Sequence, residues 1–145
     1  KVYSNYSKNN QLLMSLLLHP LNTLVAILIL LFALITLFLS SSVIFDLFDI
    51  RTREGNFVFI VVWANFITAF LYLFAAYGLW LKKIWTVPVL VAAIIILAAA
   101  FFALLIYIKQ GGFFETKTIS ALFIRIGLTL SFTFASYFII KNIKN

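Results

Sequence analysis

Residues 84–108 read IWTVPVLVAAIIILAAAFFALLIYI, an unbroken apolar run without a charged residue. About 20 apolar residues, at about 1.5 Å each, let a helix cross a hydrocarbon core of about 30 Å. Three more apolar runs, at residues 21–45, 57–81 and 118–140, occupy most of the remaining chain. All four runs are longer than the strands of a membrane barrel, which need about 9–11 residues of alternating pattern. The runs therefore predict four transmembrane helices.

The composition of the chain favours the same class. Hydrophobic residues make up 65% of its 145 residues and charged residues 10%, whereas an ordinary soluble domain is about 45–50% apolar and about 25% charged. We therefore predict an all-α membrane protein, a single transmembrane domain over residues 1–145 that forms a four-helix bundle. The chain has no cysteine, which excludes disulfides, thiolate metal sites and cysteine nucleophiles.

The segment before Pro20 allows two interpretations. Leu12, Leu13, Leu16 and Leu17 recur at helical spacing, which predicts a short N-terminal helix lying in the membrane interface. Alternatively, this segment lengthens the first transmembrane helix and Pro20 kinks it. The first apolar run exceeds the 7–15 apolar residues typical of a cleaved signal peptide. The chain does not begin with Met, so whether residues precede Lys1 stays open.

The distribution of charge predicts the orientation in the membrane. With four spans, one face of the membrane receives basic residues and no acidic ones: Lys1, Lys8, Lys82, Lys83, Lys141 and Lys144. The other face receives four basic and all four acidic residues: Arg51, Arg53, Lys109, Lys117, Asp46, Asp49, Glu54 and Glu115. Since an excess of basic residues marks the cytoplasmic side, we expect both termini in the cytoplasm.

Arg125 is the main candidate for a functional residue, because it lies inside the fourth apolar run. It is about eight residues from the outer end of that run, roughly 10 Å into the membrane. A charge there costs about 2.5 kcal/mol or more, and a guanidinium cannot lose its proton. Thr118, Thr129 and Ser136 share its helical stripe, so we expect this face to point into the bundle.

Three roles are open for Arg125. As a structural clasp it would pair with a loop carboxylate, for which Asp46, Asp49 and Glu115 are the candidates. As a ligand anchor it would hold an anionic group or a lipid headgroup that enters from the outer side. The side chains expected to help in that role come from the second and fourth runs: Asn65, Thr68, Tyr72 and Thr129. In the third role, its long stem reaches the membrane surface from a lipid-facing position.

Other chemistry finds little support in the sequence. We expect no enzyme, no cofactor and no metal site, because the chain lacks a Ser-His-Asp set, paired intramembrane aspartates, a His cluster and a phosphate-binding loop. The acidic residues lie among basic ones, so solvated loop charge is favoured over a cation site. The basic residues are scattered over both membrane faces, which does not favour nucleic acid as a partner.

A resemblance to a known family rests on two segments. The first begins with GNFV at residues 55–58 and continues through VWANF at 62–66 to GLW at 78–80; the second is ETKT at 115–118, followed by Ala121 and Arg125. These segments resemble a family of small, uncharacterised bacterial four-helix inner-membrane proteins. The resemblance implies the four-helix topology and the bacterial inner membrane, and it implies no activity.

Three functions follow as expectations. The first is an accessory or structural membrane subunit, or a self-associating scaffold, with Arg125 as its clasp. Gly127, Ser131 and Ala135 form a small-residue seam that would let another helix approach; it predicts helix packing first and self-association second. The expected partners are a second copy or a larger membrane complex. The second is a small transporter or ligand-binding protein that uses Arg125 and Asn65. The third and least favoured is an enzyme acting on lipid, for which only Glu115 and Asp46 offer an acid or base.

Overall fold

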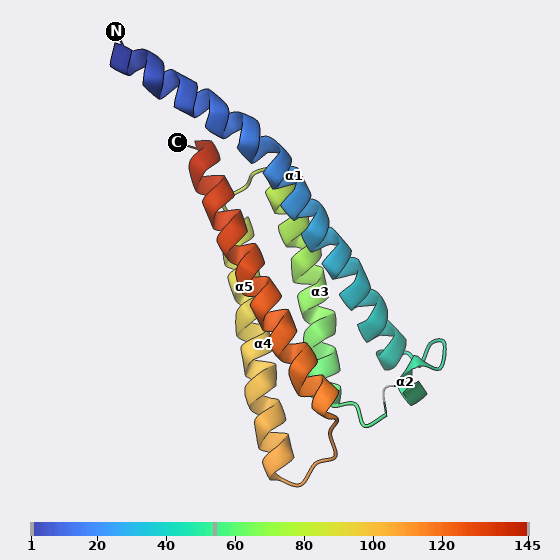
Figure 1. The fold of residues 1–145 in the computed structure, drawn as a ribbon. Helices are drawn as coiled ribbons and strands as arrows, with labels where there is room; N and C mark the ends of the chain where they lie inside the picture. Colours follow the sequence, from blue (N-terminus) through green and yellow to red (C-terminus); the bar gives the residue numbers. More distant parts are fainter. Residues whose placement is uncertain (1, 54, 145) are drawn as a thin grey trace.

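The computed structural model describes residues 2–53 and 55–144, and all regular secondary structure in these ranges is helical. Four long helices form a bundle (Figure 1): α1 (Val2–Ile44), α3 (Phe59–Trp80), α4 (Thr86–Lys109) and α5 (Thr116–Lys144). A short helix, α2 (Ile50–Arg53), lies in the connection from α1 to α3. The predicted all-helical fold with four long apolar helices is thus confirmed.

All four long helices are long and apolar enough to cross a membrane. The second and third predicted spans, 57–81 and 84–108, match α3 and α4 to within two residues at each end. The fourth, 118–140, lies within α5, which continues to Lys144. Most of the first, 21–45, lies in α1, which begins at Val2 and ends at Ile44.

α1 passes through Pro20 without a break. Of the two interpretations of the N-terminal segment, the structure shows the longer first helix, not a separate helix that ends before Pro20. The first buried side chain in the described part of α1 is Leu18, while Leu12, Leu13, Leu16 and Leu17 are exposed. Figure 1 shows this segment bending away from the bundle and extending beyond the end where the C-terminus lies. A proline inside a helix causes such a bend, because it removes one hydrogen bond and crowds the preceding turn.

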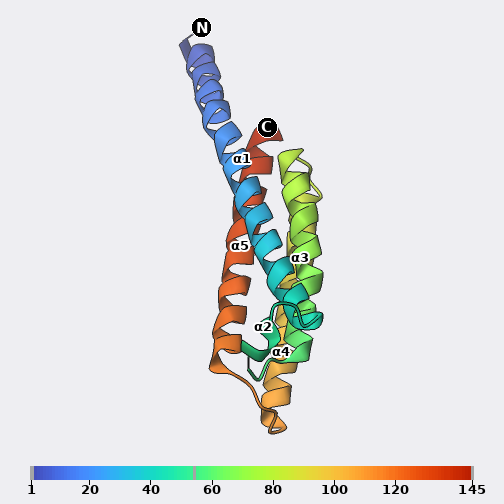
Figure 2. The same ribbon diagram turned by 90° about the vertical axis from the view of Figure 1, so that its right-hand side faces the viewer.

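The four long helices are arranged as a ring. α1 packs against α3, α3 against α4, α4 against α5, and α5 against α1. Consecutive long helices run in opposite directions, so both termini lie at one end and α2 at the other (Figures 1 and 2). We call these the terminal end and the α2 end. α3 and α5 therefore occupy opposite corners of the bundle, as do α1 and α4.

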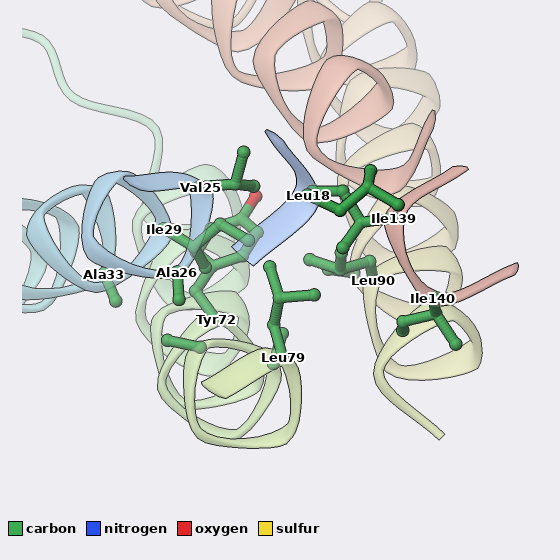
Figure 3. Close-up of a cluster of buried hydrophobic side chains, with 13 residues drawn as sticks. Leu18, Val25, Ala26, Ile29, Ala33, Tyr72, Leu79, Leu90, Ile139 and Ile140 are labelled. Carbon is green, nitrogen blue, oxygen red and sulfur yellow. The ribbon is translucent and has the colours of Figure 1, made fainter. Parts of the chain in front are cut away.

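The interior of the bundle contains two apolar clusters. The larger lies toward the terminal end and includes Leu18, Leu79, Leu90 and Ile139, which come from four different helices (Figure 3). The smaller lies toward the α2 end, with these buried members: Val58, Val61, Leu97, Leu104 and Leu122. Dispersion contacts of this kind are a main source of helix association in lipid, where apolar burial itself adds little.

The outside of the bundle is also apolar. Large hydrophobic side chains more than half exposed occur on all four long helices, for example Leu24, Phe74, Ile95 and Phe134. Water-soluble monomers rarely expose continuous apolar surface on this scale. The outer surface therefore fits a hydrocarbon environment, in agreement with the four candidate membrane-spanning helices.

The connection from α3 to α4 is a tight turn at the terminal end. Lys82 has a left-handed backbone conformation (φ 53°), and the N–H of Lys83 donates to the carbonyl oxygen of Gly78 at 2.8 Å. A side chain at position 78 would meet Trp85 and Thr86, since a Cβ there would lie 2.6 Å from Thr86 Oγ1. Gly78 therefore lets the start of α4 pack directly on α3.

Candidate functional site

Arg125 is partly buried on α5 and contacts α1. Its Nη1 donates a hydrogen bond to Oγ1 of Thr36 at 2.9 Å. Its guanidinium carbon Cζ lies 5.8 Å from the ring centroid of Phe32, one turn earlier in α1, which is within cation–π range. The guanidinium thus turns toward α1, contrary to the interpretation in which it reaches outward through lipid. Thr129 and Ser136 are fully buried, so the inward orientation predicted for this stripe is confirmed for them.

A second set of hydrogen bonds joins α5 to α3. Thr129 Oγ1 donates to the backbone oxygen of Arg125 at 2.7 Å, and the same Oγ1 lies 2.6 Å from the hydroxyl of Tyr72. A threonine hydroxyl has one hydrogen. Because that hydrogen goes to Arg125, Tyr72 must be the donor to Thr129. Tyr72 in turn packs on α1, with its ring centroid 5.2 Å from that of Phe32.

These contacts form one continuous group of side chains, which we call the central polar cluster: Phe32, Thr36, Tyr72, Arg125 and Thr129. Its members come from α1, α3 and α5. The cluster therefore links three of the four long helices through polar and aromatic contacts in an otherwise apolar interior.

Thr68 and Asn65 lie on α3 beside the cluster. The hydroxyl of Thr68 donates to the backbone oxygen of Asn65 at 3.1 Å, so its hydrogen is used within its own helix. The side-chain oxygen of Asn65 is buried and has no hydrogen-bond partner within the described part of the chain. Arg125 does not bond to this oxygen and donates instead to Thr36 of α1, which is adjacent to α5.

A cavity of about 330 Å³ opens at the α2 end between α1, α3 and α5, and we call it the α2-end cavity. Four of its lining side chains carry a charge or an amide: Asn65, Glu115, Lys117 and Arg125. Most of the others are aliphatic: Leu39, Val43, Val58, Val61, Val62, Ala121 and Leu122. Of the predicted ligand-binding residues, Arg125 and Asn65 thus share a cavity. Thr68, Tyr72 and Thr129 are fully buried and do not line it.

The predicted carboxylate partners of Arg125 are separated from one another. Glu115 lines the α2-end cavity together with Arg125, and its carboxylate lies against Gly55, where a Cβ would be. Asp46 and Asp49 are exposed in the turn after α1, both with left-handed backbone conformations (φ 54° and 53°), and they do not line the cavity. Glu54 falls outside the described residues. An ion pair to Arg125 from Asp46, Asp49 or Glu115 stays a prediction.

No group of three or more His, Cys, Asp or Glu side chains suited to a metal ion forms within residues 2–53 and 55–144. His19 lies at the terminal end, where its Nδ1 is 3.1 Å from Nζ of Lys82. This contact places a cation beside the imidazole, and a cation disfavours binding of a metal ion at the same position.

Sequence reasoning missed Phe32, Thr36 and Lys117. Thr36 carried a usable signal, because it is the only polar residue within residues 24–39. At about 1.5 Å per residue, the depth of Thr36 below the outer end of α1 is about the same as the depth of Arg125 below the outer end of α5. Phe32 carried no distinct signal, because it is one of many aromatic residues in the apolar runs.

The fold fits the class of multi-pass membrane proteins, on the strength of its four candidate membrane-spanning helices. No protein-family model, curated protein or solved structure matches the chain. The resemblance to small bacterial inner-membrane proteins therefore stays a prediction.

Proposed function

We propose that this protein is a small multi-pass membrane protein that acts as an accessory or structural subunit, or as a self-associating scaffold, with Arg125 as its intramembrane clasp. The hydrogen bond from Arg125 to Thr36 is the observation that carries the proposal. Arg125 carries a permanent charge, and its guanidinium contacts a hydroxyl and an aromatic ring of the same chain. These contacts support a structural role for the charge. In lipid, such polar contacts between helices contribute directly to association.

The proposed location is the bacterial inner membrane, with both termini in the cytoplasm. The excess of basic residues at the terminal end supports this orientation, and the family resemblance supports the compartment. The proposed partner is a second copy or a larger membrane complex, and it is supported by Gly127 and Ser131, which lie exposed on α5. Within the described residues, no atom of a neighbouring helix lies within 4 Å of where a Cβ on Gly127 would be, so the seam is open at Gly127, whereas Ala135 packs against the larger apolar cluster.

Mass measurement in native lipid tests the proposal. The protein is extracted in polymer-bounded lipid discs without detergent, and the protein mass per disc is determined. We expect a mass well above that of one 16.5 kDa chain, and Gly127→Leu, which fills the seam, should lower it. A single chain per disc at all expression levels would contradict the proposal.

A second candidate function is ligand binding or small-molecule transport, and the α2-end cavity favours it. This cavity is lined by both Arg125 and Asn65, two residues predicted to hold a ligand. Its volume is at the lower limit of the roughly 300–1,000 Å³ typical of ligand sites. Ligand-dependent thermal stabilisation that is lost in Asn65→Leu would support this function.

A further inference from the structure

A narrow groove lies between α1 and α3, and we call it the α1–α3 groove. Its volume is about 200 Å³, and its walls are apolar or aromatic: Ala26, Ile27 and Leu30 of α1 and Leu73, Tyr77 and Trp80 of α3. It shares no lining residue with the α2-end cavity. We propose that this groove binds one acyl chain of an anionic phospholipid and that the phosphate of this lipid contacts Lys82.

The dimensions of the groove favour a single hydrocarbon chain as its occupant. Leu73 and Trp80 of α3 lie seven positions apart, so the groove extends about 10 Å along the helix. Its volume divided by this length gives a mean cross-section of about 20 Å². A helix with its side chains is about 10–12 Å in diameter and needs about 80 Å² or more. The groove therefore accommodates an extended acyl chain, whereas a helix of a second copy is too wide.

Two aromatic side chains lie at the end of the groove nearest the terminal end of the bundle. Tyr77 and Trp80 are both more than half exposed, and Trp80 is the last residue of α3. Tryptophan and tyrosine are enriched where a membrane meets water, because each side chain has an apolar body and a polar group. The groove thus begins at the level of the lipid headgroups and continues from there into the hydrocarbon region.

His19 and Lys82 lie at this same end of the groove. Two groove residues of α1, Ala26 and Leu30, follow His19 after seven and eleven positions, which is close to two and three full helical turns. His19 therefore continues the α1 wall of the groove beyond the terminal end. Nζ of Lys82 lies 3.1 Å from Nδ1 of His19, so this contact joins α1 to the α3–α4 turn directly at the opening.

Lys82 provides the charge that complements a lipid phosphate. Its ammonium has three hydrogens, and the contact with His19 occupies one of them. The acidic side chains that the structure describes, Asp46, Asp49 and Glu115, all lie at the α2 end, so none of them competes for this ammonium. Basic pockets between transmembrane helices on the cytoplasmic side are typical sites for anionic headgroups, and the proposed orientation places the terminal end on that side.

Native mass spectrometry of the full-length protein in a neutral detergent tests the site. The probes are phosphatidylglycerol, phosphatidylcholine with the same acyl chains, and glycerol 3-phosphate, which has a phosphate and no acyl chain. We expect the first phosphatidylglycerol to bind at a concentration about fivefold or more below that of phosphatidylcholine. Glycerol 3-phosphate should not displace it at the same concentration. Equal affinities for the two lipids, or displacement by glycerol 3-phosphate, would overturn the proposal.

Charge variants separate this site from general attraction to a basic surface. Lys82→Gln should reduce the preference for phosphatidylglycerol by about fivefold. Lys141→Gln is the matched control, because it removes the same charge at the terminal end from α5, which lies at the opposite corner from α3. Equal losses in the two variants would assign the preference to surface charge and overturn the site at Lys82.

A bulky side chain in the groove tests the acyl-chain part of the site. Ile27 is 41% exposed and lines the groove, so Ile27→Trp fills it and should weaken binding of both lipids while the preference for phosphatidylglycerol remains. Ile95→Trp is the matched control, because Ile95 is 63% exposed on α4 and does not line the groove. Unchanged lipid binding in Ile27→Trp would overturn the proposal. If this variant also lowered the protein mass per lipid disc, the groove would belong to a contact with a second copy.

Discussion

The hydroxyl of Tyr72 lies 2.6 Å from Oγ1 of Thr129, although their helices occupy opposite corners of the bundle. Only a long side chain spans this diagonal, and the tyrosine ring also packs against Phe32 of α1, with the two ring planes tilted by 55°. The bond therefore joins α3 to α5 directly through the interior, while Arg125 and Thr36 join α5 to α1. In the described residues α4 has no part in these bonds, and it is held by apolar contacts such as those of Leu90, Leu97 and Leu104.

Tyr72→Phe removes the diagonal hydrogen bond and keeps the ring. Thr129 retains its bond to the backbone of Arg125, so the loss concerns one interaction. Hydrogen bonds between helices in membrane proteins contribute about 0.6 kcal/mol on average and up to about 1.7 kcal/mol. We expect Tyr72→Phe to lower the free energy of unfolding, measured by titration with a denaturing detergent, by an amount within that range. Tyr77→Phe on the exposed side of α3 is the control and should change it by far less; equal losses would argue against the diagonal bond.

Thr36→Val tests the clasp while leaving the arginine in place. The substitution preserves the shape of the side chain and leaves Nη1 of Arg125 without its hydroxyl acceptor in an apolar region. We expect a loss of about 1.5–3 kcal/mol in the free energy of unfolding, as for bonds to charged groups. Thr23→Val is the matched control, because Thr23 lies on the same helix, is exposed and bonds only to the backbone of His19.

A double-mutant cycle with Arg125→Met and Thr36→Val measures the coupling between the two residues. Contacting residues typically show interaction energies of about 0.5–3 kcal/mol. A coupling energy near zero would mean that Arg125 is stabilised by other groups and that Thr36 is not its partner in the clasp.

The four long helices were predictable because hydrocarbon thickness sets a minimum length for each apolar run. The face that each helix turns inward was much harder to predict. In α4 nearly every residue from Val87 to Ile108 is apolar, so no amphipathic pattern distinguishes the buried Leu90 and Leu97 from the exposed Ile95 and Phe102. In α5, by contrast, the positions of Arg125, Thr129 and Ser136 predicted which face of the helix turns into the bundle, because polar groups avoid lipid.

The candidate site was predictable only in part. Polar residues identified Arg125, Asn65 and Tyr72, but the pairing among them depends on the order of helices around the ring, which apolar runs do not encode. Asn65 was expected to hold a ligand together with Arg125, and both line the α2-end cavity, whereas Thr36, which accepts the hydrogen bond from Arg125, was not identified. The path of the N-terminal segment was also open, because a proline in an apolar helical segment is compatible with both a break and a bend.

Gly78→Ala tests the close approach of α4 to α3. A Cβ at this position would lie 2.6 Å from Thr86 Oγ1 and 2.7 Å from the ring of Trp85, so α4 must shift. Overpacking of this kind costs about 1–3 kcal/mol. Gly127→Ala is the matched control when the protein is measured as a detergent-solubilised monomer, in which the proposed contact between copies is absent: a Cβ there meets no atom of a neighbouring helix within 4 Å in the described residues, and alanine favours the helix by about 0.5–1 kcal/mol. Detergent-titration curves should move in opposite directions for the two variants; movement in the same direction would contradict the packing.

Ser136→Ala should stabilise the protein. The hydroxyl of Ser136 is fully buried and has no hydrogen-bond partner in the described residues, and an unpaired buried hydroxyl costs about 1–3 kcal/mol. Alanine removes this cost with little change in volume. Ser15→Ala is the control, since Ser15 is exposed and donates to the backbone of Leu12. The midpoint of thermal unfolding in lipid discs should rise for Ser136→Ala alone, and a fall would show that the hydroxyl has a partner such as a buried water.

The predicted orientation can be tested by labelling at the two ends of α4, because the chain has no cysteine of its own. Ile84→Cys places a thiol at the terminal end, where residue 84 is 61% exposed and carries no charge that contributes to orientation. Gln110→Cys places one at the α2 end; position 112 is less suitable, because a side chain there would collide with the ring of Tyr107. With both termini in the cytoplasm, a membrane-impermeant maleimide should label intact cells at position 110, and at position 84 only after lysis. The reverse pattern would place the termini outside, and the α2-end cavity would then open to the cytoplasm.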